Sequence, residues 1–85
     1  MADYGDLVQI DRGASEWPYK QLAAKLRARI ASGELGPKLP SIMRLAEQAG
    51  VAPGTGQRAL DLLKEEGLVY GADGLGIFVT RQQED

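Results

Sequence analysis

The fold is decided by residues 41–67, SIMRLAEQAGVAPGTGQRALDLLKEEG, which contain two helical patterns separated by three residues. Ser41 is suited to cap the first helix, because its hydroxyl can accept a hydrogen bond from an exposed backbone N–H group. Gly50 ends that helix, and Pro53 begins the second, which continues to Gly67. Two helices joined by so short a glycine-containing turn are typical of a helix-turn-helix unit.

A further helix is predicted ahead of this unit. Leu22, Leu26 and Ile30 recur every four residues, which places them on one face of a helix. Pro18 suits the first turn, where its missing N–H group costs nothing. Gly33 follows the last apolar residue of the pattern and is expected to act as the C-cap.

The remaining segments predict a small antiparallel sheet. Residues 36–40, GPKLP, cannot lie inside a helix, because the two prolines interrupt helical hydrogen bonding. Residues 68–70 and 77–80 have the composition of strands, and the glycines and aspartate of residues 71–76 favour a hairpin turn between them. The element order predicts an α+β fold, mainly α: a winged helix-turn-helix with three helices and a β-hairpin wing.

The amino-acid composition excludes several kinds of catalytic and metal-binding site. The 85-residue chain contains no cysteine and no histidine, so it lacks disulfides, thiolate metal ligands and the commonest general base. We therefore expect no catalytic residues, no metal site and no cofactor, and the protein is not predicted to be an enzyme. No apolar run approaches the ~20 residues that a membrane span needs. The start of the chain lacks the basic-then-apolar order of a signal peptide, which predicts a cytoplasmic protein.

The formal net charge of −2 is lower than that of a typical DNA-binding domain. Its distribution is uneven, because residues 17–80 carry eight basic and six acidic side chains while both ends are acidic. We divide the chain into an acidic N-terminal segment, 1–16, a winged-helix domain, 17–80, and a flexible tail, 81–85. Residues 7–10, LVQI, are compatible with a short strand.

Several stretches carry a family resemblance. They are PYKQL (18–22), LRARIASGEL (26–35), LPS (39–41), LAEQAGV (45–51), RALDLLKEEGLV (58–69) and GLGIFV (74–79). In this order they resemble the DNA-binding domain of the GntR family of bacterial repressors. The resemblance implies a winged-helix fold, double-stranded DNA as the partner and a role in transcription regulation. Family members usually carry a second, effector-binding domain, so these residues are either one domain of a longer regulator or a stand-alone version.

The sequence departs from the family at the positions that usually read DNA. The family usually has arginine where this chain has Met43, Pro53 and Gln57. Its wing usually carries basic residues, whereas residues 71–76 contain Asp73 as their one charged residue. An arginine that clasps guanine contributes about 1–3 kcal/mol of discrimination. We therefore expect weak DNA binding or a different sequence preference.

Seven residues are candidates for DNA contact. They are Lys38, Ser41, Arg44, Thr55, Gln57, Arg58 and Gly74. Glutamine can pair with two edge atoms of adenine, and threonine can touch a phosphate or a thymine methyl group. Lys38 and Ser41 lie near a helix start, where backbone N–H groups favour phosphate, and Arg44 is placed to reach the DNA backbone. The alternative in each case is structural: a solvated helix residue, a cap at Ser41, or a turn residue at Gly74.

Two functions of different classes remain open. In the first, the chain is a small transcriptional regulator that places the helix from Pro53 in the major groove and the wing, 71–76, beside it. In the second, the winged helix has lost DNA binding and contacts a protein partner or a second copy of itself. The missing arginines and the acidic ends favour the second interpretation.

The start of the helix at Pro53 is also predicted to be weak. Ala52 has no side-chain oxygen with which to cap the helix, a loss of about 1 kcal/mol. Gly54 and Gly56 each disfavour the helix by up to about 1 kcal/mol relative to alanine. We expect this first turn to fray.

Overall fold

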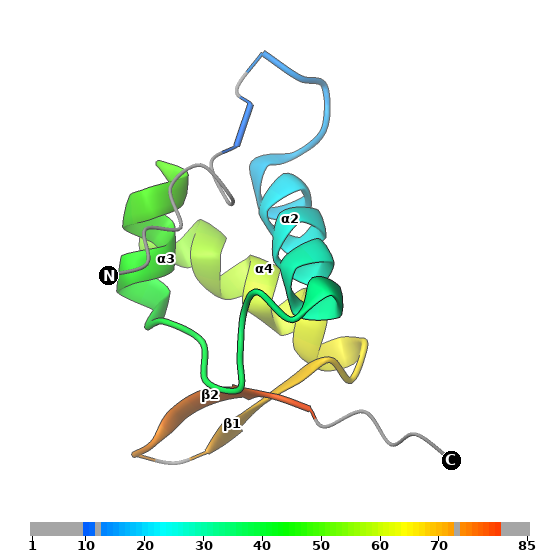
Figure 1. Cartoon of the computed structure of the whole chain (residues 1–85). Coiled ribbons are helices and arrows are strands. Elements are labelled where there is room, and N and C mark those ends of the chain that lie inside the picture. The colour runs from blue at the N-terminus through cyan, green and yellow to red at the C-terminus, as the bar shows by residue number, and fades with distance from the viewer. Residues whose placement is uncertain (1–9, 12, 73, 81–85) are drawn as a thin grey trace.

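A computed structural model of the chain describes residues 10–11, 13–72 and 74–80, and within them it has the predicted winged-helix architecture (Figure 1). The helices and strands are α2 (Pro18–Ser32), α3 (Ile42–Ala49), α4 (Pro53–Glu65), β1 (Val69–Ala72) and β2 (Gly76–Val79). Within these residues, no helix is both long and apolar enough to cross a membrane. The predicted strand at 7–10 lies outside the described residues except for Ile10, which has no strand partner assigned and is buried in the core.

The helix ends confirm the predictions made from serine, proline and glycine. The hydroxyl of Ser41 accepts a hydrogen bond from the backbone N–H of Arg44 at 3.2 Å. Gly33 and Gly50 follow α2 and α3 with φ angles of 84° and 77°, a left-handed conformation that glycine adopts without steric cost. Pro18 opens α2, as predicted.

The core is built by α4, which packs against both α2 and α3. Its largest fully buried side chains are Leu22, Leu26, Leu45, Leu60 and Leu63. Burying a leucine completely contributes about 1.5–3 kcal/mol, so these five residues supply much of the stability of so small a chain. The leucines of α4 therefore fix its position, and with it the position of its exposed N-terminal turn.

The sheet differs from the prediction at the hairpin turn. Gly71 and Ala72 continue β1, and Gly76 begins β2, so that Ala72 pairs with Gly76 and Gly71 with Ile77. The predicted turn over 71–76 is therefore too long, because glycine-rich residues that favour a turn are held in the ladder by strand pairing. The described residues between the strands are Gly74 and Leu75.

A third segment extends the sheet on the free edge of β2. The N–H of Leu39 donates to the carbonyl of Ile77 at 2.9 Å, and the N–H of Val79 donates to the carbonyl of Pro37 at 2.7 Å. Figure 1 shows the connection between α2 and α3 descending to the sheet at this point. The segment that the prolines exclude from a helix is thus a short extended piece that ties the helices to the wing.

Gly56 is buried where α4 crosses α3. A Cβ atom at this position would lie 3.3 Å from the Cβ of Ala46 and 3.6 Å from Cγ2 of Ile42. At Gly54, two residues earlier in α4, a Cβ would meet nothing within 4 Å. The two glycines therefore differ in kind: Gly56 permits a close approach of the two helices, whereas Gly54 has no packing reason to lack a side chain.

We predict that Gly54→Ala stabilises the protein by about 0.5–1 kcal/mol, the usual gain in helix propensity. The same change at Gly56 gains little, because the new methyl group crowds Ala46. Gly56→Val destabilises by about 1–3 kcal/mol through overpacking. Urea unfolding midpoints of the three variants measure these effects. Wild-type stability of Gly56→Val would contradict the close approach.

An ion pair joins α2 to the end of α4. The guanidinium of Arg27 donates from Nε to Oε1 of Glu66 at 2.8 Å and from Nη2 to Oε2 at 2.6 Å. These hydrogen bonds and the charge of Arg27 hold the pKa of the Glu66 carboxyl below its ordinary value. A two-bond pair of this geometry fixes orientation as well as supplying attraction.

This lowered pKa gives the ion pair a small, acid-sensitive part in stability, because both side chains are partly exposed and screened by solvent. A carboxyl whose folded-state pKa is depressed stabilises the protein above its unfolded pKa, about 4.3 for glutamate, and that contribution is lost as pH falls through the lower folded value. We predict that Glu66→Gln lowers stability at pH 7 and flattens its dependence on pH below about 4.5. Thermal unfolding across pH 2.5–7 measures the effect. Glu65→Gln, the exposed neighbour, is the control and should leave the profile unchanged.

Candidate nucleic-acid interface

The turn between α3 and α4 is built by backbone hydrogen bonds. The N–H of Val51 donates to the carbonyl of Ala46 at 2.9 Å, which closes the end of α3. The carbonyl of Ala52 accepts from the N–H groups of Thr55 and Gly56 at 3.0 and 3.1 Å, and no side chain caps α4. Helix α4 therefore begins at Pro53, as predicted, with the missing cap also as predicted. The expected fraying of this turn stays a prediction.

The predicted contacts before α3 lie at the base of the helix and on the adjoining extended segment. Ser41 and Arg44 are exposed at the start of α3, where the Ser41 hydroxyl is already used as the cap. Lys38 bridges to Phe78 of β2. Its Cε atom lies 2.9 Å from the position that a Cβ of residue 76 would take, so its aliphatic stem lies over Gly76. Lys38 thus belongs to the wing in space, although it precedes α3 in sequence.

Two of the three predicted contacts on α4 already have side-chain partners within the chain. The side-chain amide of Gln57 donates to Oδ1 of Asp61 at 2.7 Å. The guanidinium of Arg58 lies over the ring of Tyr19, 4.2 Å from its centroid, which is the geometry of a cation–π contact. Thr55 is half-buried in the first turn. All three residues therefore lie on α4, but Arg58 packs against Tyr19 of α2 and Gln57 is hydrogen-bonded to Asp61.

The wing presents few polar groups. Gly74 has a φ of 74° and is exposed, and Leu75 beside it is an exposed apolar residue. Tyr70 and Phe78 stack across the strands with ring centroids 5.9 Å apart. The described part of the hairpin has no cation of its own; Lys38 and Lys64 supply theirs from outside, with Nζ atoms 3.7 and 3.8 Å from the positions that a Cβ of residues 76 and 71 would take.

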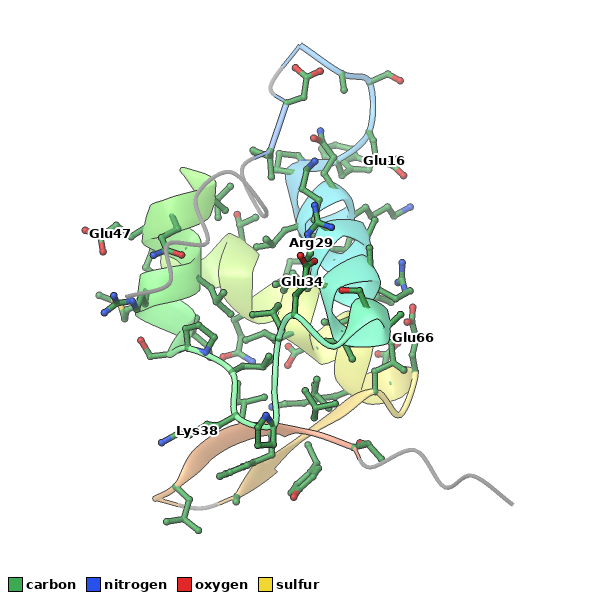
Figure 2. The ribbon with its side chains drawn as sticks, viewed as in Figure 1. Glu16, Arg29, Glu34, Lys38, Glu47 and Glu66 are labelled. Atoms are coloured by element: carbon green, nitrogen blue, oxygen red, sulfur yellow. The ribbon has the colours of Figure 1, made fainter. Side chains whose placement is uncertain are left out.

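Two arginines already form ion pairs with glutamates of the chain, so we do not count them as candidate DNA contacts. Arg27 pairs with Glu66, and Arg29 pairs with Glu34 at 3.2 Å. Figure 2 shows Glu66 on the side of the molecule opposite to that from which Lys38 and Glu47 project. The cations at the start of α3 and beside the wing are therefore Arg44, Lys38 and Lys64, and Glu47 of α3 opposes them in charge.

The structure also brings together a set of residues that the sequence analysis did not group. Met43, Ala46, Glu47, Val51 and Pro53 line a hollow of about 330 Å³ between α3 and the start of α4. The signal was present in the sequence, because two of these residues stand where the resemblance expects arginine. The sequence alone indicates lost contacts at these two positions, whereas in the structure both residues line the same hollow. Among the described residues there is no cluster of acidic side chains suited to a metal ion.

Comparison with known proteins decides the family. The family profile described as "Bacterial regulatory proteins, gntR family" matches residues 18–79, which is most of the chain. This chain belongs to the GntR family. The resemblance noted in the sequence is thus confirmed, and the chain is a DNA-binding domain of a GntR-family transcription regulator.

Individual relatives agree with this assignment. The transcriptional repressor NagR of Bacillus subtilis is 42% identical over 65 residues, covering 74% of this chain and 27% of the repressor. The GntR-family transcription factor YtrA of Sulfolobus acidocaldarius has the same fold with a TM-score of 0.80 and 34% identity, covering 91% of this chain and 83% of that one. The structure of AraR(DBD) in complex with operator ORX1 matches with a TM-score of 0.72 and 31% identity, covering 82% and 90%. The chain spans between 27% and 56% of the length of the curated relatives it matches.

The contact between Gln57 and Asp61 leads to a prediction about DNA binding by this GntR domain. Asp61→Asn keeps an acceptor for the Gln57 amide but removes a negative charge, so duplex affinity should rise at low salt. Asp61→Ala removes the acceptor and the negative charge, so it should raise duplex affinity as much as Asp61→Asn does. It should also change the sequence preference, because Gln57 loses its hydrogen-bond partner and is free to contact a base. Binding of randomised duplexes followed by sequencing measures the preference. Identical preferences of the two variants would show that the tether has no influence on base reading.

Proposed function

We propose that this domain binds duplex DNA with the N-terminal turn of α4 in the major groove and with the start of α3 and the wing on the flanking backbone. The observation that carries the proposal is that Ala52, Pro53 and Gly54 are exposed at the start of α4, a helix held in place by its own buried leucines. In a helix-turn-helix unit the N-terminal residues of the second helix contact base edges. The similar AraR(DBD) was solved in complex with an operator, which supports DNA as the partner of this domain.

Each candidate residue has a role in this proposal. Lys38 and Arg44 neutralise phosphates, and backbone N–H groups at the start of α3 donate hydrogen bonds to a third phosphate. Gln57 and Thr55 approach base edges, Gln57 after release from Asp61. Gly74 lets the wing backbone lie close to the DNA, since it has no side chain. Arg58 contacts a phosphate at the border of the site while it rests on Tyr19.

We further propose that affinity is lower, or the sequence preference different, than in relatives that carry arginine at positions 43, 53 and 57. Each phosphate-neutralising cation adds a salt-dependent increment to affinity, and this domain has few free cations on the relevant face. The setting we propose is a cytoplasmic transcriptional regulator.

The second candidate function is a protein-binding module, with self-association as one form of it. Two exposed apolar residues favour this alternative: Met43 on α3 and Leu75 in the wing. The exposed acidic residues Asp61 and Glu65 of α4 favour it too. The two functions differ in their salt dependence. A protein-binding module has no salt-sensitive affinity for duplex DNA, whereas a DNA-binding domain does.

We predict that the domain binds a mixed-sequence duplex and that affinity falls steeply between ~50 and ~200 mM salt. Fluorescence anisotropy of a labelled duplex measures it. Lys38→Gln should reduce the slope of log affinity against log salt by about 1, since one phosphate contact is lost. Lys25→Gln, an equal change of charge on α2, is the control and should keep the slope. Absence of binding at ~50 mM salt would exclude the proposed function and favour the protein-binding alternative.

A further inference from the structure

The hollow between α3 and α4 suits a contact of a kind that the charged candidates do not provide. Four of its five lining residues are apolar, namely Met43, Ala46, Val51 and Pro53, and the fifth is Glu47. Met43, Ala46 and Glu47 are three and four residues apart, so they share one face of α3. The Met43 side chain is 67% exposed, which leaves a large apolar group facing solvent.

The position of the hollow links it to base reading. Pro53 is the first residue of α4, and the N-terminal residues of the second helix of such a unit lie against base edges. Val51 belongs to the turn that joins the two helices. A duplex docked on α4 would therefore place a base edge, rather than solvent, over Pro53 and the neighbouring Met43.

The chemistry of the lining selects among the groups in the major groove. Base edges there present acceptors, amino donors and one apolar group, the C5-methyl of thymine. An acceptor placed against Met43 and Pro53 would lose its hydrogen bonds to water without a replacement, and an amino donor would regain one only at the Glu47 carboxylate. A phosphate is disfavoured for a second reason, because the Glu47 carboxylate on the rim repels it.

We propose that this hollow receives the C5-methyl group of a thymine, so that Met43, Val51 and Pro53 read that base by apolar contact. The inference rests on the proposed function, since it requires a bound duplex. Methionine suits the task, because its unbranched thioether chain adapts to an irregular surface. Positions 43 and 53 then contribute sequence preference without charge.

The test begins with a duplex enriched from a randomised pool by the wild-type domain at ~50 mM salt. Each thymine of the enriched duplex is replaced in turn by deoxyuridine, which lacks only the methyl group. At one or two positions the replacement should weaken binding about fourfold, the effect of losing one buried methyl group. The salt slope should stay the same, because no phosphate contact changes.

Variants assign the effect to the hollow. Met43→Ala should weaken binding to the thymine duplex about fourfold and abolish the difference between thymine and deoxyuridine at that position. Trp17→Ala is the matched control, since Trp17 is 66% exposed and lies at the start of α2, and it should keep the difference. Circular dichroism of both variants confirms that they are folded.

The outcomes separate the inference from the function beneath it. Enrichment of a duplex that binds equally well with thymine and deoxyuridine at every position would overturn the methyl contact and leave DNA binding standing. A methyl effect that persists in Met43→Ala would overturn the assignment to this hollow. Failure to enrich or bind any duplex at ~50 mM salt would overturn both the inference and the proposed function.

Discussion

Helix α4 is buried on one side and exposed at its first turn, and the packing of the rest of the domain keeps it in that position. One side is buried against α2 and α3 through Leu60 and Leu63, while the first turn stays exposed for a partner. The close crossing at Gly56 sets how far that turn stands out from α3. Because packed interiors transmit small changes of volume, the geometry of the reading turn is determined by the core behind it.

The charged residues follow from the same division. The Arg27–Glu66 pair secures α2 to the C-terminal end of α4, at the opposite end of that helix from its exposed first turn. At the other end, α4 carries Gln57 bound to Asp61, and Arg58 resting on Tyr19. Both contacts order long side chains before any ligand arrives, which reduces the entropy lost on binding. The same contacts also occupy groups that a nucleic acid would otherwise engage.

Local rules account for the parts of the structure that the sequence could predict. Ser41, Gly33 and Gly50 mark helix ends through hydrogen bonds and φ angles that depend on near neighbours alone. The Gln57–Asp61 contact was also within reach, since a spacing of four residues on a helix brings such side chains together. Pairing over long separations was not: Lys38 meets Phe78, and Arg58 meets Tyr19, across about forty residues. The hairpin turn was predicted too long for the same reason, because strand pairing overrides the turn preference of glycine.

If the proposed thymine contact is made, the apolar residues at positions 43 and 53 supply a selectivity of another kind than arginine, and a smaller one: about fourfold for a methyl group against about 1–3 kcal/mol for an arginine that clasps guanine. An arginine in the groove is attracted to every duplex, because phosphates surround each site, and so it raises non-specific and specific affinity together. A methionine and a proline gain nothing from phosphate. Their contribution arises only where an apolar group of a base fills the space between α3 and α4. What matters for finding a site in a genome is the ratio of specific to non-specific affinity. A domain with few free cations on the proposed interface can therefore retain part of that ratio while its absolute affinity is low.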